Sequence, residues 1–149
     1  MKIKNKGFTL IELLVVVAII GALAAVGVVA YNGYTAAAKK NAAKAIHAGA
    51  IKFISAEVTK CVIDENDTIL GTVPCAGADT DVGLTGKEVA DGFVSLSNDK
   101  DPWLGGKAAA VVDEASEQKG KLDLVVDGQS ITISMNDDAE THSTTLTIE

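Results

Sequence analysis

Glu12 has the most unusual surroundings of any ionisable residue in this chain. It lies at the start of an apolar run, and residues 13–30 contain no charged side chain. A carboxylate at the edge of a membrane-length segment is costly, because lipid offers it neither a cation nor a hydrogen-bond donor, and it is normally kept for function. The sequence therefore predicts that Glu12 pairs with a cation or donor supplied by another group.

Cys61 and Cys75 are the two cysteines of the chain. They can form a disulfide, ligate a metal ion or take part in redox catalysis. Metal and redox roles have no support, because the cysteines form no C-x-x-C motif and His47 and His142 are too isolated in sequence to suggest a ligand set. Both histidines are predicted to be surface or packing residues. An oxidising compartment would favour the disulfide.

Asp99 and Asp101 offer oxygen atoms of the kind that bind Ca²⁺. Asp and Asn in a turn before proline, here Pro102, are more often simple turn formers. No metal site is therefore predicted, and Asp99 and Asp101 remain weak candidates. The sequence contains no phosphate-binding loop, nucleophile elbow or pair of catalytic carboxylates, so it predicts neither an enzyme nor a cofactor.

The apolar run and its flanks predict how the chain meets a membrane. The preceding residues are short and basic, with Lys2, Lys4 and Lys6 and no acid. By the positive-inside rule the N-terminus stays in the cytoplasm, and the rest, including both cysteines, is directed outward into an oxidising environment.

Three other interpretations of the apolar run remain open. A secretory signal cleaved at the A-x-A of residues 22–24 fits poorly, because the run is longer than usual and Glu12 interrupts its start. An ordinary membrane anchor fits the length but leaves Glu12 unexplained. A buried core helix fits least, since 149 residues cannot easily enclose a helix that is apolar all round.

Beyond residue 30 the apolar pattern becomes one-sided, which is typical of an amphipathic helix. The apolar positions at helical spacing are Ile46, Ala50, Phe53, Ile54 and Val58. Because no proline occurs before Pro74, one continuous helix is predicted from residue 8 to residue 60.

The second half of the chain predicts a short helical turn followed by strands. Thr85 to Glu88 fit a capping box that opens the turn, and Asp127-Gly128 predicts a tight hairpin turn. Alternating or short apolar segments predict strands at 93–96, 108–112, 122–126, 131–135 and 146–148. The predicted fold class is α+β: one long N-terminal helix, packed through Ile46, Phe53 and Val58 on a C-terminal antiparallel β-sheet of about four strands.

Charge is divided unevenly along the chain. Residues 1–60 contain eight lysines and two acids, whereas residues 61–149 contain five lysines and eighteen acids. The chain has no arginine, and an acidic surface without cations is unsuited to nucleic-acid phosphates. The acidic part complements the basic middle of a neighbouring helix, and solubility alone explains the acids equally well.

The segment from Gly7 to Gly21, GFTLIELLVVVAIIG, resembles the N-terminus of bacterial type IV prepilins, and the resemblance covers roughly residues 1 to 34. It implies cleavage after Gly7 by a membrane aspartic prepilin peptidase, N-methylation of the new terminal residue Phe8, and assembly into a filament through the N-terminal helix. Glu12 would then pair with the Phe8 amine of a neighbouring subunit. A desolvated carboxylate is tolerable beside such a cation.

The residue patterns and the resemblance together predict an organisation along the chain, although many relatives place their disulfide near the C-terminus. The segments are a cytoplasmic leader at 1–7, a transmembrane and filament-core helix at 8–30, an amphipathic continuation at 31–60, a disulfide-containing loop at 61–92 and a sheet head at 93–149. The precursor would lie in the inner membrane with its C-terminus in the periplasm, and the mature chain in an extracellular pilus that serves adhesion or motility. The implied partners are identical subunits, the prepilin peptidase, an N-methyltransferase, the inner-membrane assembly machinery, and membrane lipid before assembly.

The motif is shared with other filament proteins, so alternatives stay open. Type II secretion pseudopilins carry it, and Asp101-Pro102-Trp103 is similar to a segment of the calcium-binding members. Unlike many relatives, this chain has Val28 to Tyr31 where a proline is common, so no sharp kink is expected. The sequence predicts a structural subunit of a type IV pilus, with a pseudopilin or a monomeric membrane-anchored binding protein as alternatives.

Overall fold

The computed structural model describes residues 7–75, 84–112, 115 and 118–148. The chain divides into two compact units, residues 1–37 and residues 38–149, and each is described by itself. Most of the predicted leader, residues 1–6, lies outside the described residues, as do residues 76–83 of the predicted disulfide loop and residues 113–114, 116–117 and 149 of the predicted head.

Helix α1 covers Leu10–Ile63, close to the predicted range of residues 8 to 60. In the first unit the apolar side chains are exposed: Phe8, two residues before the helix, is 85% exposed, and Val29 within it is 74% exposed. The helix is long and apolar enough to cross a membrane. Because an α-helix satisfies its own backbone hydrogen bonds, such a segment is compatible with lipid on all sides.

In the second unit α1 buries one face, formed by residues at alternating spacings of four and three, as helical periodicity requires. These buried residues are Ala43, His47, Ala50, Ile54 and Glu57. The predicted packing of Ile46, Phe53 and Val58 is confirmed in part: Ile46 and Val58 are partly buried against the core, whereas Phe53 remains 43% exposed. The buried face is displaced because two polar side chains find partners: His47 Nε2 lies 3.0 Å from the Ile133 carbonyl oxygen, and Glu57 accepts a hydrogen bond from Leu70 N–H.

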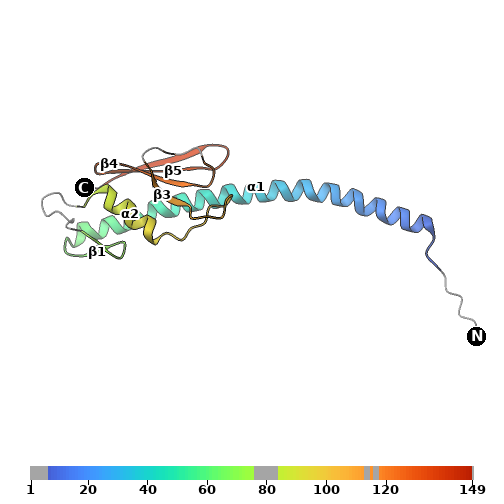
Figure 1. Cartoon of the computed structure of the whole chain (residues 1–149), viewed down its shortest axis with the longest axis horizontal. Helices are drawn as coiled ribbons and strands as arrows, with labels where there is room; N and C mark the ends of the chain where they lie inside the picture. The colour runs from blue at the N-terminus through green and yellow to red at the C-terminus, as the bar shows by residue number, and fades with distance from the viewer. Residues whose placement is uncertain (1–6, 76–83, 113–114, 116–117, 149) are drawn as a thin grey trace, which may run out of the picture. The chain divides into compact units, whose positions relative to one another are not determined.

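Four strands form the main sheet, in the order β3-β4-β5-β6. They are β3 (Ala109–Val112), β4 (Leu122–Asp127), β5 (Ser130–Asn136) and β6 (Thr141–Thr147). The sheet lies along the part of α1 coloured cyan to green in Figure 1. Its inner face carries five of the largest fully buried side chains, Leu122, Leu124, Ile131, Ile133 and Met135.

The hairpin predicted at Asp127-Gly128 is confirmed, and Asp127 pairs with Ser130. Gly128 has φ 59°, at the first turn position, where a type II′ hairpin favours glycine. β5 and β6 are also antiparallel. The prediction of a purely antiparallel sheet was wrong for one pair, because β3 and β4 are parallel. The sequence between the two strands, residues 113–121, contains no tight-turn dipeptide, and a tight turn can join only antiparallel neighbours.

The strand predicted at 93–96 was also wrong, because these residues form the end of helix α2 (Gly86–Leu96). The Thr85 capping box is confirmed: the Thr85 hydroxyl accepts from Glu88 N–H, and the Glu88 carboxylate accepts from Thr85 N–H. Val89, Ala90 and Phe93 are buried on one face of α2. A four-residue apolar window is too short to separate a strand from the last turn of a helix.

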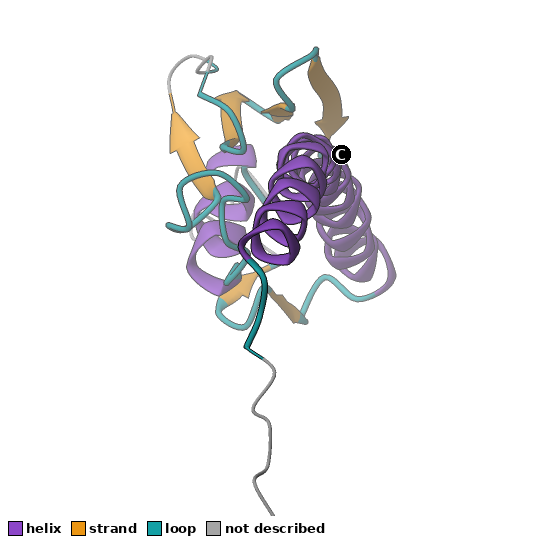
Figure 2. Cartoon of the chain, turned by 90° about the vertical axis from the view of Figure 1, so that its right-hand side faces the viewer, coloured by secondary structure: helices purple, strands orange, loops and turns teal. Residues whose placement is uncertain are grey.

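The region between α1 and α2 contains a two-stranded ladder of β1 (Thr68–Ile69) and β2 (Val73–Pro74). A disulfide joins Cys61 in the last turns of α1 to Cys75 directly after β2, with a Cα–Cα distance of 5.1 Å. Figure 2 shows the helices in purple, the strands in orange and the loops that join them in teal. The disulfide predicted for an outward-facing segment is therefore present.

The carboxylate of Glu57 fixes the middle of this ladder. Its Oε2 accepts a hydrogen bond from Leu70 N–H at 2.9 Å, and Lys60 pairs with its Oε1. The hydrogen bond from Lys60, together with that from Leu70 N–H, lowers the pKa of Glu57. Leu70 has φ 51°, a left-handed conformation that is uncommon for a non-glycine residue. Glu57 thus compensates part of the cost of this turn.

Candidate functional site

The first candidate site is the N-terminal end of α1. Gly7 and Phe8 lie in non-helical chain directly before Thr9, and both are exposed. A Cβ placed on Gly7 would meet nothing within 4 Å. The junction predicted for cleavage is therefore accessible.

The Glu12 carboxylate is occupied by its own helix end. Its Oε2 accepts hydrogen bonds from Thr9 N–H at 2.8 Å and from the Thr9 hydroxyl at 2.7 Å. In return Thr9 Oγ1 accepts from Glu12 N–H at 3.3 Å. Thr9 and Glu12 thus form a capping box, which satisfies donors that an α-helix leaves free at its start.

This local role of Glu12 was not predicted. A partner on another subunit was predicted instead, although the Thr-x-x-Glu spacing of Thr9 to Glu12 is the same signal that located Thr85 and Glu88. The capping box gives the carboxylate donors before any other chain is present. It does not provide a cation, because threonine is neutral.

Apolar side chains surround Glu12 on one face of the helix. Phe8, Ile11, Glu12, Val15 and Val16 line a shallow groove. These positions are three and four residues apart, so they are neighbours along one helix face. An apolar helix that brings a cation or donor to Glu12 matches this groove chemically.

The weak metal candidates Asp99 and Asp101 serve the loop before β3. Asp101 is buried, and its Oδ1 accepts hydrogen bonds from Trp103 N–H at 2.7 Å and Leu104 N–H at 3.0 Å. The Asp99 carbonyl accepts from Ala108 N–H. The turn-forming interpretation of Asp101 therefore fits the contacts of the described residues.

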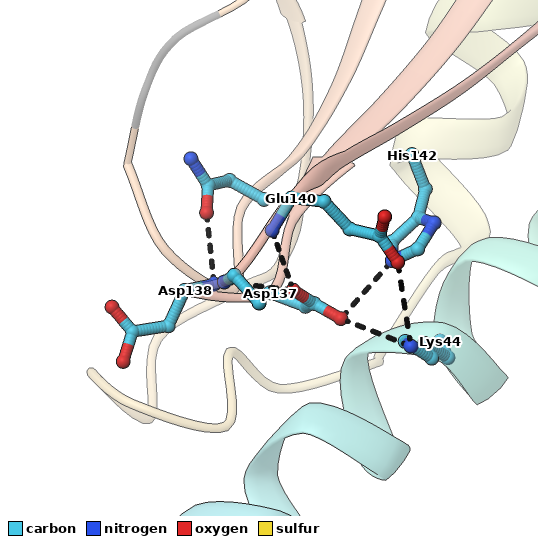
Figure 3. A network of polar contacts seen from close by, with 7 residues as sticks. Lys44, Asp137, Asp138, Glu140 and His142 are labelled. Carbon is cyan, nitrogen blue, oxygen red and sulfur yellow. Dashed lines mark hydrogen bonds and ion pairs between the residues drawn. The ribbon is translucent and has the colours of Figure 1, made fainter.

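A second cluster of ionisable side chains lies where the turn between β5 and β6 meets α1 (Figure 3). Asp137 Oδ2 is 3.0 Å from His142 Nε2 and 3.3 Å from Lys44 Nζ. Glu140 Oε1 is 3.5 Å from His142 Nε2 and 3.7 Å from Lys44 Nζ. The rings of His47 and His142 are 6.2 Å apart. Both histidines are isolated in sequence, and no local pattern indicates that β6 lies beside α1, so this cluster was not predicted.

Asp137 is buried, yet it is well supplied with donors. Besides His142 and Lys44, the backbone N–H groups of Ala139 and Glu140 donate to its Oδ1, each at 3.0 Å. The hydrogen bond from His142, followed by those from the backbone and Lys44, holds the pKa of Asp137 well below its usual range. The ionised form of Asp137 therefore stabilises the folded unit.

This shift predicts a pH dependence of stability. A lowered folded-state pKa adds stability above the unfolded value of about 3.9, and that stability is lost as the pH falls through the folded pKa. We expect Asp137→Asn to destabilise the protein at pH 7 and the deficit to shrink below about pH 4. Urea unfolding of the mature chain in detergent, followed by the fluorescence of Trp103, the single tryptophan, measures this. The exposed Asp127→Asn is the control, and a deficit that is constant from pH 7 to pH 3 would contradict the role of Asp137.

Comparison with known proteins adds an independent observation. Residues 2–28 match the family model described as the prokaryotic N-terminal methylation motif. The fimbrial protein of Moraxella nonliquefaciens is 34% identical over 137 residues, which cover 80% of this chain and 84% of that protein. The type IV major fimbrial protein FimA of Dichelobacter nodosus is 43% identical over 90 residues, which cover 59% of this chain and 48% of FimA. The alignment thus spans about half the length of FimA, and no solved structure matches the chain.

Proposed function

The chain belongs to the type IV fimbrial protein family, the type IV pilins. We propose that it is a structural subunit of a type IV pilus and that it polymerises through α1. One observation carries the proposal: in the first unit, α1 exposes apolar side chains all round and carries the carboxylate of Glu12 among them. Lipid can cover the apolar surface before assembly, but it offers Glu12 no cation. A bundle of identical helices covers the same surface and can supply one.

Processing would generate that cation. In our proposal a membrane prepilin peptidase cleaves after Gly7, and Phe8 becomes the N-terminal residue, which an N-methyltransferase then methylates. The new amine is a positive charge on the residue directly before Thr9 of the capping box, four positions before Glu12. In the filament the Phe8 amine of one subunit pairs with Glu12 of another, so that neither charge is buried alone.

The proposed location follows from the same steps. The precursor lies in the inner membrane with its basic N-terminus in the cytoplasm, and the second unit faces the periplasm, where the Cys61–Cys75 disulfide can form. The inner-membrane assembly machinery then moves the subunit into an extracellular pilus. The fimbrial relatives support a structural role over an enzymatic one, and they favour a pilus over a type II secretion pseudopilus.

Analysis of surface fibres tests this function. Fibres sheared from the cells should contain this chain as their main component, and mass spectrometry should find N-methylated Phe8 as its first residue. Electron microscopy of the same cells separates the alternatives. Long fibres support a pilus, short periplasmic structures without surface fibres indicate a pseudopilus, and a membrane-bound chain that retains Met1 indicates a monomeric anchor.

A substitution at Gly7 gives a sharper prediction for processing. We expect Gly7→Val to slow cleavage by about a hundredfold, because a branched side chain displaces the peptide bond from the catalytic groups of the peptidase. The structure offers space for valine at this position, so the uncleaved chain should still fold. The fraction of cleaved chain after a pulse of labelling measures the effect, with the smaller Gly7→Ala as the graded control. Normal cleavage of Gly7→Val would refute the assigned junction.

A further inference from the structure

The cluster at the β5–β6 turn brings together side chains that can ligate a metal ion. Three different donor atoms converge there: Asp137 Oδ2, Glu140 Oε1 and His142 Nε2, all within 4.8 Å of one another. Among the described residues, no other three metal-ligating side chains lie this close to one another. We propose that these three side chains bind a divalent transition-metal ion of the zinc type. The proposal does not depend on filament assembly.

The distances from His142 Nε2 to the two carboxylate ligand atoms fit a zinc ion. Ligands about 2.0–2.1 Å from a tetrahedral Zn²⁺ ion lie about 3.3–3.4 Å from one another. The observed separations from His142 Nε2 are 3.0 Å to Asp137 and 3.5 Å to Glu140, on either side of that value. One imidazole and two carboxylates suit zinc better than calcium or magnesium, which prefer oxygen ligands alone. Three protein ligands leave a fourth position for water, as in open zinc sites.

The site is held in place before any metal arrives. Asp137 is 1% exposed, and two backbone N–H groups fix its Oδ1, so that Oδ2 is the atom directed at His142. Hydrogen bonds of this kind orient metal ligands and strengthen binding. Glu140 is 63% exposed, so an ion can reach the cluster from solvent. The cluster therefore combines a buried anchor with an open side.

The ammonium group of Lys44 already lies beside two carboxylates of the cluster. Its Nζ lies 3.3 Å from Asp137 Oδ2 and 3.7 Å from Glu140 Oε1 (Figure 3), which are two of the proposed ligand atoms. Half of the Lys44 side chain is exposed, so it can turn into solvent. Zinc and Lys44 thus compete for the same two carboxylates. Zinc also takes the place of the proton that His142 Nε2 donates to Asp137, and this proton moves to Nδ1 or to solvent when the metal binds.

Direct binding of ZnCl₂ tests the proposal. The mature full-length chain is purified in detergent without a polyhistidine tag, and bound zinc is measured by equilibrium dialysis and elemental analysis. We expect one saturable zinc ion per chain. Glu140→Gln and His142→Gln should each weaken binding by at least about tenfold, since even loss of an outer partner of a ligand costs that much. Lys44→Gln should bind up to about fivefold tighter, because the ion pair no longer competes.

Two controls make the result decisive. Asp127→Asn removes an exposed acid from the other hairpin turn of the same sheet and should bind zinc like the unchanged chain. Glu140 and His142 are chosen over the buried Asp137 because their replacement is less disruptive to folding, which circular dichroism verifies. Zinc binding that persists in His142→Gln, or the absence of saturable binding in both the unchanged chain and Lys44→Gln, would overturn the proposal.

Discussion

Cells that produce the Glu12→Gln subunit are expected to insert and cleave it normally and to display almost no surface fibres. Glutamine keeps an oxygen that can complete the capping box with Thr9, but it removes the negative charge. In the proposed filament the Phe8 amine of the neighbour would then be buried without a counter-charge, at a cost of about 3–5 kcal/mol. A loss of this size weakens each contact between subunits by about a hundredfold or more.

The capping box makes a matched control necessary. Thr9→Ala removes the hydroxyl that donates to Glu12 but keeps the carboxylate, so it weakens the helix end by about 1 kcal/mol. If charge pairing decides assembly, Thr9→Ala cells should retain most of their fibres and Glu12→Gln cells should lose theirs. If capping decides it, the order is reversed.

Immunogold counting of surface fibres, together with the amount of cleaved subunit in the membrane, gives the answer. A membrane anchor that never assembles would behave differently, because Glu12→Gln only makes its span more apolar and improves insertion. Normal fibre numbers in Glu12→Gln cells would refute the pairing role of Glu12. Reduced cleavage in either variant would show that the substitution acts before assembly.

Local signals in the sequence predicted local structure well. The Thr85–Glu88 spacing located the start of α2, and Asp127-Gly128 located the β4–β5 turn. The absence of proline predicted the length of α1 to within a few residues at each end. Each of these features is determined by residues that are close together in the sequence, so a short sequence pattern predicts it.

Features that depend on distant residues were predicted less well. The parallel pairing of β3 with β4 follows from how the whole sheet forms, and Asp137 meets Lys44 because β5 and β6 pack beside α1. Burial of His47 requires the Ile133 carbonyl, which no nearby residue indicates. Glu12 is a different case. The Thr9–Glu12 spacing is a local signal for a capping box, but only a distant partner was predicted, because Glu12 lies at the edge of an apolar segment.

Loss of the Cys61–Cys75 disulfide is expected to destabilise the second unit by about 2–5 kcal/mol. The two cysteines are 14 positions apart, and closing a loop of about 15 residues is worth about 3 kcal/mol in the chain-entropy model. The bond ties the end of α1 to the end of β2, while Glu57 holds Leu70 between them. Without the bond, the hydrogen bond from Leu70 to Glu57 and the pairing of β1 with β2 must hold the left-handed turn at Leu70.

The double variant Cys61→Ser, Cys75→Ser is the appropriate test, because a single substitution leaves a reactive thiol. Urea unfolding of the mature chain in detergent is followed by Trp103 fluorescence, which reports on the second unit. The detergent covers the apolar part of α1 in the first unit. Val62→Ser, an adjacent α1 position that is 72% exposed, is the matched control and should change the free energy of unfolding by less than about 0.5 kcal/mol. Reduction of the unchanged chain should reproduce the double variant. If the double variant is as stable as Val62→Ser, the hydrogen bond from Leu70 to Glu57 and the packing of β1 and β2 suffice to hold the ladder, and the disulfide contributes no measurable stability.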